Sequence, residues 1–392
     1  MSDFFEIESR YTSGVYAKRH VTVVRGEGAV LWDDQGREYI DCVGGQGTAN
    51  LGHANAAVAA AIAAQAQRLI SCPEIFPNDQ RAALMERLTQ LTGMPRVFLC
   101  NSGTEAVEAA IKFARVATKR TEIVAAMRGF HGRTFGALSA TWNKAYREPF
   151  EPLVPGYSHV PYNNIEALRQ AVTDKTAAVI LEVVQGEGGV YPGSAEYLLG
   201  AQQLCRERGA LLIVDEVQTG FGRTGKLFAI QHHKLQPDLL CLAKSIAGGL
   251  PMGATMIGER VGVLPGHIHG STFGGNPLAC AASLAALSEM ERLDLPARAA
   301  ENGAYFRERL QEINSPLIRE VRGLGLLMGV ELKKKSAPYI QALGKRGVLA
   351  LSAGMNVIRF LPPLVITREQ LDRVTDTLTR VLAEPAPEAV AE

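Results

Sequence analysis

The sequence contains few cysteines and no two of them at close spacing. Six occur in 392 residues, none in a C-x-x-C pair, at positions 42, 72, 100, 205, 241 and 280. This scatter argues against a function that depends on paired cysteines. Because each cysteine lies in or beside an apolar stretch, we expect buried free thiols and a reducing, cytoplasmic setting.

The chain also lacks an apolar run of membrane-spanning length. The longest apolar stretch, residues 54–66, is Ala-rich and carries polar breaks, whereas a membrane span needs about 20 strongly apolar residues. We interpret this stretch as a core helix. The N-terminus has neither the basic nor the apolar region of a signal peptide. We therefore expect no membrane partner.

Neither sign of charge is in excess, since 41 basic and 40 acidic residues leave a net charge of +1. Such a balance gives no general attraction to nucleic acid or to an anionic membrane. Lys333 to Lys335 form the one compact basic run, which we interpret as the solvated start of a helix.

The pattern along the chain predicts two domains, because 392 residues exceed one ordinary core. Residues 21–41 favour an antiparallel β unit with a turn at 33–36. From residue 54, helices alternate with short apolar strands, which predicts an α/β fold with a mostly parallel sheet covered by helices on both faces. The expected helices are 54–69, 78–92, 103–118, 163–173 and 194–208. The expected strands are 96–99, 122–125, 177–181, 211–214 and 239–242.

A smaller α+β unit is expected after a long helix that runs from Pro277 to about Leu293. Its strands lie near 318–321, 326–331 and 357–360, and its last helix near 368–382. The chain therefore divides into an N-terminal segment that packs with the small domain, a large domain, the small C-terminal domain and a disordered tail. Their bounds are 1–50, 51–276, 277–382 and 383–392.

Two reactive side chains stand at the ends of expected strands, where ligands of α/β sheets are found. Asp215 ends the strand 211–214, and such a carboxylate can pair with a protonated pyridine nitrogen, although a helix cap or a structural ion pair would also use it. Lys244 follows the strand 239–242. Desolvation among apolar neighbours would make its amine neutral and nucleophilic, whereas an ordinary surface lysine would need no such setting.

Two short segments add candidate ligand contacts. Residues 101–105 follow a strand and open a helix, so their N–H groups suit an anion such as phosphate, and equally a plain N-cap. In the segment 129–134, Phe130 could stack on an aromatic ring. Arg133 could hold a carboxylate with both arms of its guanidinium group.

Other patterns are weaker. Residues 220–226 match the start of a nucleotide-hydrolase phosphate loop, but Leu227 stands where Ser or Thr is required and no strand precedes the loop. No G-x-G-x-x-G follows the first α/β strand, which argues against a dinucleotide dehydrogenase. The paired histidines at 232–233 and 267–269 lack partners at ligand spacing, so we expect no metal site.

Together these segments resemble the class III aminotransferases of fold type I, of the ornithine and acetylornithine type. The likeness covers the chain from about Tyr16 to Leu382. The segments that carry it are 101–106, 129–134, 185–189, 215–225, 243–245, 271–277 and 358–364. The resemblance implies a pyridoxal 5′-phosphate (PLP) enzyme, with the cofactor in the large domain 51–276.

The resemblance also implies roles around the cofactor. Lys244 is the Schiff-base lysine and moves the proton once it is free, and Asp215 pairs with the pyridine nitrogen. Thr272 resembles a residue that reaches the phosphate in the neighbouring subunit, which implies a homodimer with shared active sites. The remaining implied contacts are Gln218 on the ring hydroxyl, Val217 and Phe130 on the ring faces, and Ser102, Gly103 and Thr104 on the phosphate.

Two arginines then correspond to two substrates. By resemblance, Arg133 holds the α-carboxylate of an ω-amino acid, with Tyr16 as helper and Ser271 as a further substrate contact. Arg359 takes the α-carboxylate of glutamate or 2-oxoglutarate. Glu187 pairs with Arg359 while the ω-amine is bound, because an unpaired arginine would attract the wrong carboxylate.

Within the class, the sequence is closer to enzymes that act on lysine or ornithine carried by the small acidic protein LysW than to N-acetylornithine aminotransferases. Gln46 departs from the family by replacing a Tyr or an apolar residue. An aminomutase of the same fold would not need the Glu187–Arg359 pair, and a silent PLP-binding protein would tolerate loss of Lys244. The segments that favour the carrier-linked branch are 13–16, 39–45, 146–150, 318–323 and 332–340.

Overall fold

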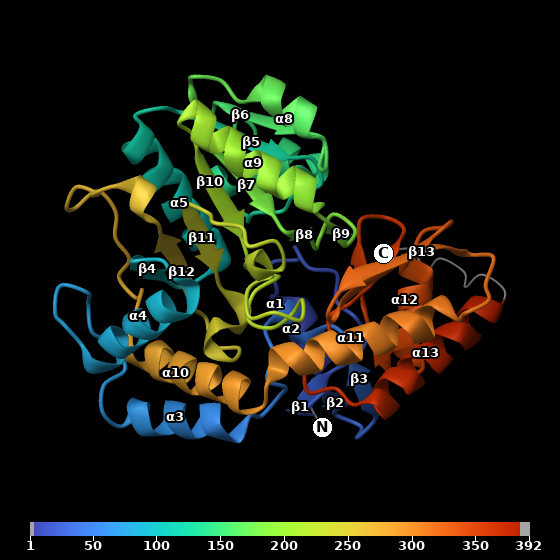
Figure 1. The fold of residues 1–392 in the computed structure, drawn as a ribbon. Helices are drawn as coiled ribbons and strands as arrows, with labels where there is room; N and C mark the ends of the chain where they lie inside the picture. Colours follow the sequence, from blue (N-terminus) through green and yellow to red (C-terminus); the bar gives the residue numbers. More distant parts are fainter. Residues whose placement is uncertain (1–3, 385–392) are drawn as a thin grey trace.

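The computed structural model describes residues 4–384, and its central element is a seven-stranded sheet (Figure 1). The strand order is β4-β12-β11-β10-β7-β5-β6. Neighbouring strands are parallel except where β12 pairs with β11 and β4. The bounds are β4 Arg96–Cys100, β5 Glu122–Ala126, β6 Tyr157–Val160, β7 Thr176–Glu182, β10 Leu211–Asp215, β11 Leu239–Leu242 and β12 Gly253–Ile257.

Every strand predicted for this sheet is present, whereas β6 and β12 were missed. β6 has the sequence Tyr-Ser-His-Val at the sheet edge, and β12 begins with glycine. Neither has the continuous apolar run on which the prediction depended. Both lie where the sequence signal for a strand is weak.

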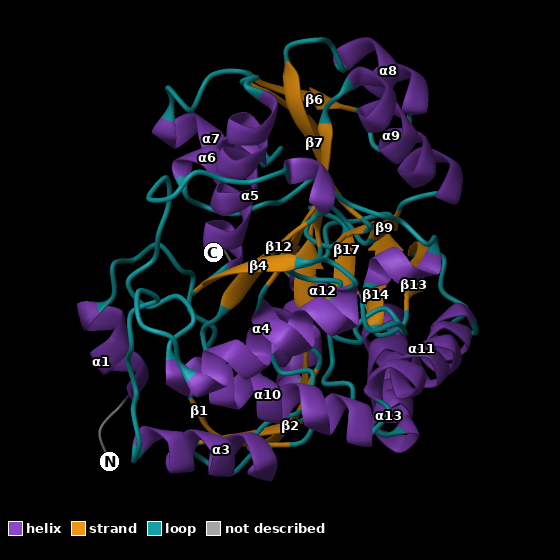
Figure 2. Ribbon diagram, turned by 60° about the vertical axis from the view of Figure 1, so that its left-hand side comes forward, coloured by secondary structure: helices purple, strands orange, loops and turns teal. Residues whose placement is uncertain are grey.

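Helices cover both faces of the sheet, which is why the central strands β7, β10 and β11 are buried along their whole length. Leu212 and Val214 of β10 belong to the apolar cluster that includes residues of α9 (Ala195–Arg208). Leu211 and Ile213 belong to a second cluster with residues of α5 (Gly103–Thr118). Alternate side chains of a strand point to opposite faces, so the mostly parallel α/β prediction is confirmed. Figure 2 shows α5 and α9 on opposite sides of the sheet.

The interpretation of the Ala-rich stretch as a core helix is wrong. The helix α3 (Ala56–Ala66) forms, but Val58 and Gln65 are its buried residues and most of its alanines are exposed in the chain. Alanine favours a helix strongly yet offers little side chain to bury. The helix α3 packs beside α10 (Pro277–Arg292). Together with α4 (Asp79–Thr92), these helices border a surface groove.

The small domain is an antiparallel sheet of order β13-β14-β17-β16 with helices packed on it. A second sheet, β1-β2-β3-β15, joins the N-terminal segment to this domain through the parallel pair of β3 and β15. The bounds are β1 Val23–Glu27, β2 Val30–Asp33, β3 Glu38–Asp41, β13 Ile318–Leu324, β14 Leu327–Leu332, β15 Val348–Leu349, β16 Leu351–Ala353, β17 Val357–Phe360, α11 Leu295–Gln311, α12 Ala337–Lys345 and α13 Arg368–Ala383.

Shorter elements lie between these strands and helices. A two-stranded hairpin, β8 (Val184–Gln185) and β9 (Tyr191–Pro192), lies between the central sheet and the small domain (Figure 1). The others are α1 Phe4–Tyr11, α2 Gly44–Gly47, α6 Phe135–Ala140, α7 Lys144–Arg147, α8 Ile165–Ala171 and the 3₁₀ turns at 148–150, 229–232, 244–247 and 259–261.

Three smaller expectations can be compared with the structure. Five cysteines are buried as expected, but Cys72 is partly exposed. The exposed run Lys333 to Lys335 directly precedes α12, as interpreted. Ala383 ends α13 and is not part of a disordered tail, and residues 385–392 lie outside the described residues. Within residues 4–384 no helix is both long and apolar enough to span a membrane.

Candidate active site

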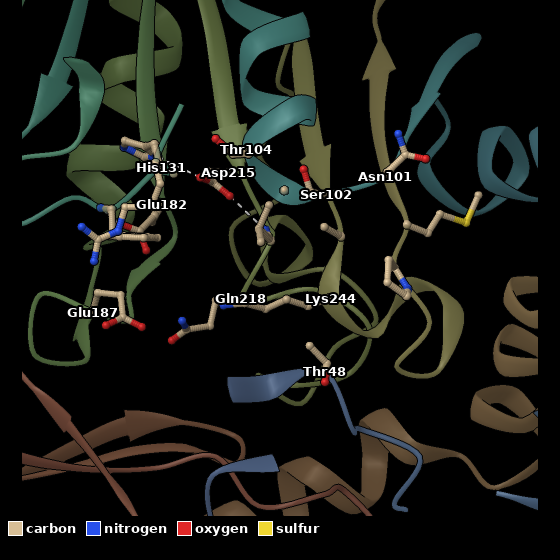
Figure 3. A pocket seen from close by; sticks show the side chains of 18 of the residues that line it. Thr48, Asn101, Ser102, Thr104, His131, Glu182, Glu187, Asp215, Gln218 and Lys244 are labelled. Atoms are coloured by element: carbon tan, nitrogen blue, oxygen red, sulfur yellow. Dashed lines mark hydrogen bonds and ion pairs between the residues drawn. The ribbon is translucent and has the colours of Figure 1, made fainter. Parts of the chain in front are cut away.

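A cavity of about 380 Å³ opens at the carboxyl ends of the central strands. Asp215 ends β10, Glu182 is its neighbour at the end of β7, and Lys244 follows β11 (Figure 3). The lining comprises Thr48, Asn101, Ser102, Gly103, Thr104, Phe130, His131, Gly132, Arg133, Glu182, Glu187, Asp215, Val217, Gln218, Ala243, Lys244, Gly249, Leu250, Pro251 and Met252.

Lys244 stands in a tight turn at the base of this cavity. It opens the 3₁₀ turn Lys244–Ala247 with a φ of 51°, a left-handed conformation that is uncommon outside glycine. The next residue, Ser245, donates its hydroxyl to the carbonyls of Gly47 and Thr48 and so holds the turn. Burial lowers the pKa of Lys244 to about 8, although the charge of Glu187 opposes this shift. With this pKa about a tenth of the amine is neutral at pH 7, far more than for an ordinary lysine.

Asp215 is held by a histidine that sequence reasoning left without a role. The Asp215 Oδ2 atom lies 2.8 Å from Nδ1 of His131, and Asp215 Oδ1 accepts the N–H of Val217 at 3.0 Å. Burial lowers the pKa of His131, but the hydrogen bond and charge of Asp215 outweigh it and the net pKa is raised. Because an ionised carboxylate can only accept, Nδ1 of His131 carries the shared proton.

Glu182 is a second buried acid that the sequence analysis missed. Its oxygens accept the N–H groups of Phe130 at 3.0 Å and Gly186 at 3.2 Å. Burial raises the pKa of Glu182 to about 7, with His131 opposing and Asp215 reinforcing the rise. The signal for Glu182 was available, because it ends a strand just as Asp215 does.

The N-terminus of α5 presents unused hydrogen-bond donors to the cavity. Ser102 caps the helix by accepting the N–H of Glu105 at 3.3 Å, which leaves its own hydroxyl proton free. The N–H groups of Gly103 and Thr104 stand in the first turn, where a helix offers them no acceptor. A Cβ on Gly103 would lie 2.7 Å from Val217. The close approach of helix and loop therefore requires glycine there.

The hydroxyl of Thr104 is already engaged within the protein. Thr134 donates its single hydroxyl proton to Glu108 at 2.6 Å. The 2.7 Å contact between the Thr104 and Thr134 hydroxyls must then use the proton of Thr104. In this arrangement an anion at α5 would be held by the Ser102 hydroxyl and the helix N–H groups.

The two arginines named from the sequence differ in their partners. Arg359 is buried, and it donates to Glu187 Oε1 at 2.7 Å and to Gln218 Oε1 at 3.0 Å. The charge of Arg359 holds the pKa of Glu187 low against the opposing effect of burial. Arg133 lines the cavity and stacks on Tyr146, with 3.6 Å from its Cζ to the ring centroid. Within residues 4–384 no carboxylate pairs with Arg133.

Four named residues lie outside the lining of the cavity, and one of them, Arg359, contacts it through Glu187 and Gln218. Tyr16 is 73% exposed in the N-terminal segment. Ser271 accepts a hydrogen bond from the amide of Asn101 at 3.0 Å and closes a turn with Gly274. Thr272 is exposed in the loop before α10. The chain alone therefore does not bring Tyr16, Ser271 and Thr272 to the site.

Fold and site together define a PLP-dependent transferase of fold type I. A lysine with a lowered pKa, a strand-end carboxylate and an anion-binding helix N-terminus are the donor set that this cofactor requires. Residues 12–382 match the model of the family described as Aminotransferase class-III. The protein belongs to this family.

Relatives and solved structures agree with this assignment. The chain is 53% identical to the [LysW]-aminoadipate semialdehyde transaminase of Deinococcus radiodurans, over 100% of this chain and 93% of that protein. It is 44% identical to the acetylornithine aminotransferase of Methanothermobacter thermautotrophicus, over 97% and 99%. The ornithine aminotransferase of Toxoplasma gondii superposes with a TM-score of 0.93 at 36% identity, over 97% and 94%.

Proposed function

We propose that this aminotransferase moves the ω-amino group of an N2-acylated lysine or ornithine to 2-oxoglutarate, giving a semialdehyde and glutamate. The preferred substrate in this proposal is lysine linked to a LysW-type carrier protein. The observation that carries it is the contrast between the two arginines. Arg133 faces the cavity without a carboxylate partner, while Glu187 occupies Arg359 at 2.7 Å.

The large domain, residues 51–276, provides the groups that would hold PLP. Asp215, oriented by His131, would keep a proton on the ring nitrogen, and Gln218 would face the ring hydroxyl. When bound, PLP supplies an aldehyde for the amine and an electron sink for the carbanion. The groups proposed for the faces and the phosphate are Val217 and Phe130, and Ser102, Gly103 and Thr104.

Lys244 has two tasks in this proposal. Its neutral amine would hold the cofactor, and once free the amine would move the proton at the substrate carbon. Both tasks need the uncharged amine, and a pKa of about 8 makes this form far more abundant near neutral pH than it is in an ordinary lysine. Leu250, Pro251 and Met252 add apolar side chains to the cavity that Lys244 lines.

The arginines would select the substrates in turn. Arg133 would bind the α-carboxylate of the ω-amino substrate, so the distal amine would reach the cofactor and the acyl group would point outward. The stack of Tyr146 on the guanidinium face leaves its edge free for a carboxylate. For 2-oxoglutarate, Glu187 would release Arg359. An aminomutase would have no use for this exchange.

The remaining parts of the site would come from a second copy of the chain. Thr272 is exposed in this chain and is proposed to reach the phosphate in the partner's site, in a homodimer. Tyr16 and Ser271 are proposed to complete the substrate contacts. The segment 1–50 is proposed to pack with the small domain 277–382, to which β3 is joined.

The substrate is tested by comparing LysW-linked lysine with N-acetylornithine, each with 2-oxoglutarate. We expect a higher kcat/KM with the carrier-linked substrate. N-acetylornithine is the alternative because the acetylornithine aminotransferases are also similar over nearly the whole chain. A higher kcat/KM with N-acetylornithine would assign the protein to that branch.

A further inference from the structure

The Glu187 carboxylate is carried by the connection between β8 and β9, and a single row of the small-domain sheet supports that connection. Arg322 on β13 is the register partner of Gly329 on β14, and Gly329 is the partner of Arg359 on β17. Cross-strand partners share a face of the sheet. The row therefore places one arginine on each side of Gly329, which has no side chain.

Each member of this row meets the hairpin at a different point. Arg359 binds the Glu187 carboxylate at 2.7 Å. Arg322 donates to the Gly189 carbonyl at 2.9 Å and 2.6 Å and to the Val190 carbonyl at 3.2 Å. A Cβ on Gly329 would lie 3.0 Å from Val190, so the absent side chain makes room for this residue.

Val190 adopts a conformation that its own chemistry disfavours. Its φ is 57°, which is a true outlier for a β-branched residue. Such a conformation persists when the surroundings impose it, and it concentrates at functional sites. Here Val190 is fully buried in a small cluster with Leu327 and Leu361 of the small domain.

The guanidinium of Arg322 is itself fixed on several sides. It is buried, and it binds Glu331 at 2.6 Å and Glu320 at 2.8 Å. Its Cζ lies 3.9 Å from the ring centroid of Tyr191 in β9. The Arg322 head can therefore transmit the position of the small-domain sheet to the hairpin backbone.

We propose that Arg322 is a positioning residue that sets where Glu187 stands against Arg359, and through it the choice between the two substrates. This inference rests on the proposed function. Arg322 touches neither substrate nor cofactor pocket. It holds the backbone two and three residues beyond Glu187, so Glu187 meets Arg359 without relying on their ion pair alone.

The test compares Arg322→Lys with Arg319→Lys in the PLP-loaded enzyme. Lysine keeps a charge for Glu331 but lacks the planar fork that spans two carbonyls. Arg319 is the matched control, because it also pairs with Glu331, at 3.1 Å, from the same strand but is largely exposed. Gly329→Ala is a second variant that presses on Val190 while leaving both arginines in place.

The measurement is the single-turnover absorbance change with glutamate and with the ω-amine substrate that reacts faster with the unaltered enzyme. We expect Arg322→Lys and Gly329→Ala to lower the ω-amine to glutamate rate ratio roughly fivefold, about the factor for one lost hydrogen bond. Arg319→Lys should leave it unchanged. Amide hydrogens of residues 186–192 should exchange faster in Arg322→Lys than in Arg319→Lys.

Two results would overturn the positioning role. One is an equal loss in both half-reactions of Arg322→Lys, which would make the residue merely structural. The other is unchanged amide exchange in the hairpin. Glu187→Gln separates this failure from that of the proposed function. If Glu187→Gln itself leaves the ratio unchanged, the proposed role of Glu187 in masking Arg359 is wrong, whatever the result for Arg322.

Discussion

The Nδ1 atom of His131 lies 2.8 Å from the Asp215 carboxylate, and both groups are buried in the lining of the cavity. The other ring nitrogen of His131 has no hydrogen-bond partner among the described residues. Asp215 therefore orients the histidine, and the histidine in turn holds the Oδ2 atom of Asp215 in place. This pair determines how strongly a proton would be held on the ring nitrogen of a bound pyridine.

Replacing His131 should weaken the cofactor site without emptying it. We expect His131→Phe to reduce PLP affinity roughly tenfold, because Asp215 loses one charge-assisted hydrogen bond. Asp215→Ala should reduce turnover far more than His131→Phe, since the ring nitrogen loses its partner entirely. Fluorescence titration of the apo-protein gives the affinities, and thermal melting checks the fold. An Asp215→Ala variant with near-normal turnover would contradict the pairing.

The lowered pKa of Lys244 predicts how cofactor capture depends on pH. A lysine amine is neutral above its pKa, so the rate of PLP attachment to the apo-protein should rise as pH passes through about 8 and then level off. Borohydride trapping followed by peptide mass spectrometry measures both rate and position. Lys244→Ala is the control and should trap no cofactor. Label on a different lysine in the unaltered protein would refute the assignment.

Arg133 should matter for one half-reaction and not the other. Arg133→Lys keeps the charge but loses the planar fork and the stack on Tyr146. We expect kcat/KM for the ω-amine to fall tenfold or more, which corresponds to about 2 kcal/mol. Glutamate, held by Arg359, should react nearly as before. Equal losses with both substrates in single-turnover absorbance would argue against separate arginine sites.

Thr272 predicts a site shared between two chains. We expect sedimentation to show a homodimer at assay concentration. Thr272→Val should weaken PLP binding, because the phosphate loses a hydroxyl donor. Mixing Thr272→Val with Lys244→Ala chains should restore sites that combine Lys244 from one chain with Thr272 from the other. Unchanged PLP affinity in Thr272→Val dimers, or an active monomer, would rule out this arrangement.

Sequence reasoning identified the reactive groups at the strand ends. It gave no role to the neighbouring side chains of His131, Glu182 and Tyr146. Lys244 and Asp215 follow apolar strands, and the strand pattern places both at one edge of the sheet. His131 and Tyr146 were unassigned because their roles depend on contacts 84 residues away in the chain and on a cation–π stack. Spacing along the chain carries no such information.

The sequence by itself determined the local structure and the reactive groups, because hydrophobic periodicity, helix caps and residue chemistry act over a few neighbours. It specified α3 as a helix through its alanines. Only the tertiary structure decided that α3 is largely exposed, that His131 meets Asp215, and that Arg322, Gly329 and Arg359 form one row. The physical reason is that burial, ion pairing and cross-strand register depend on which distant elements pack together.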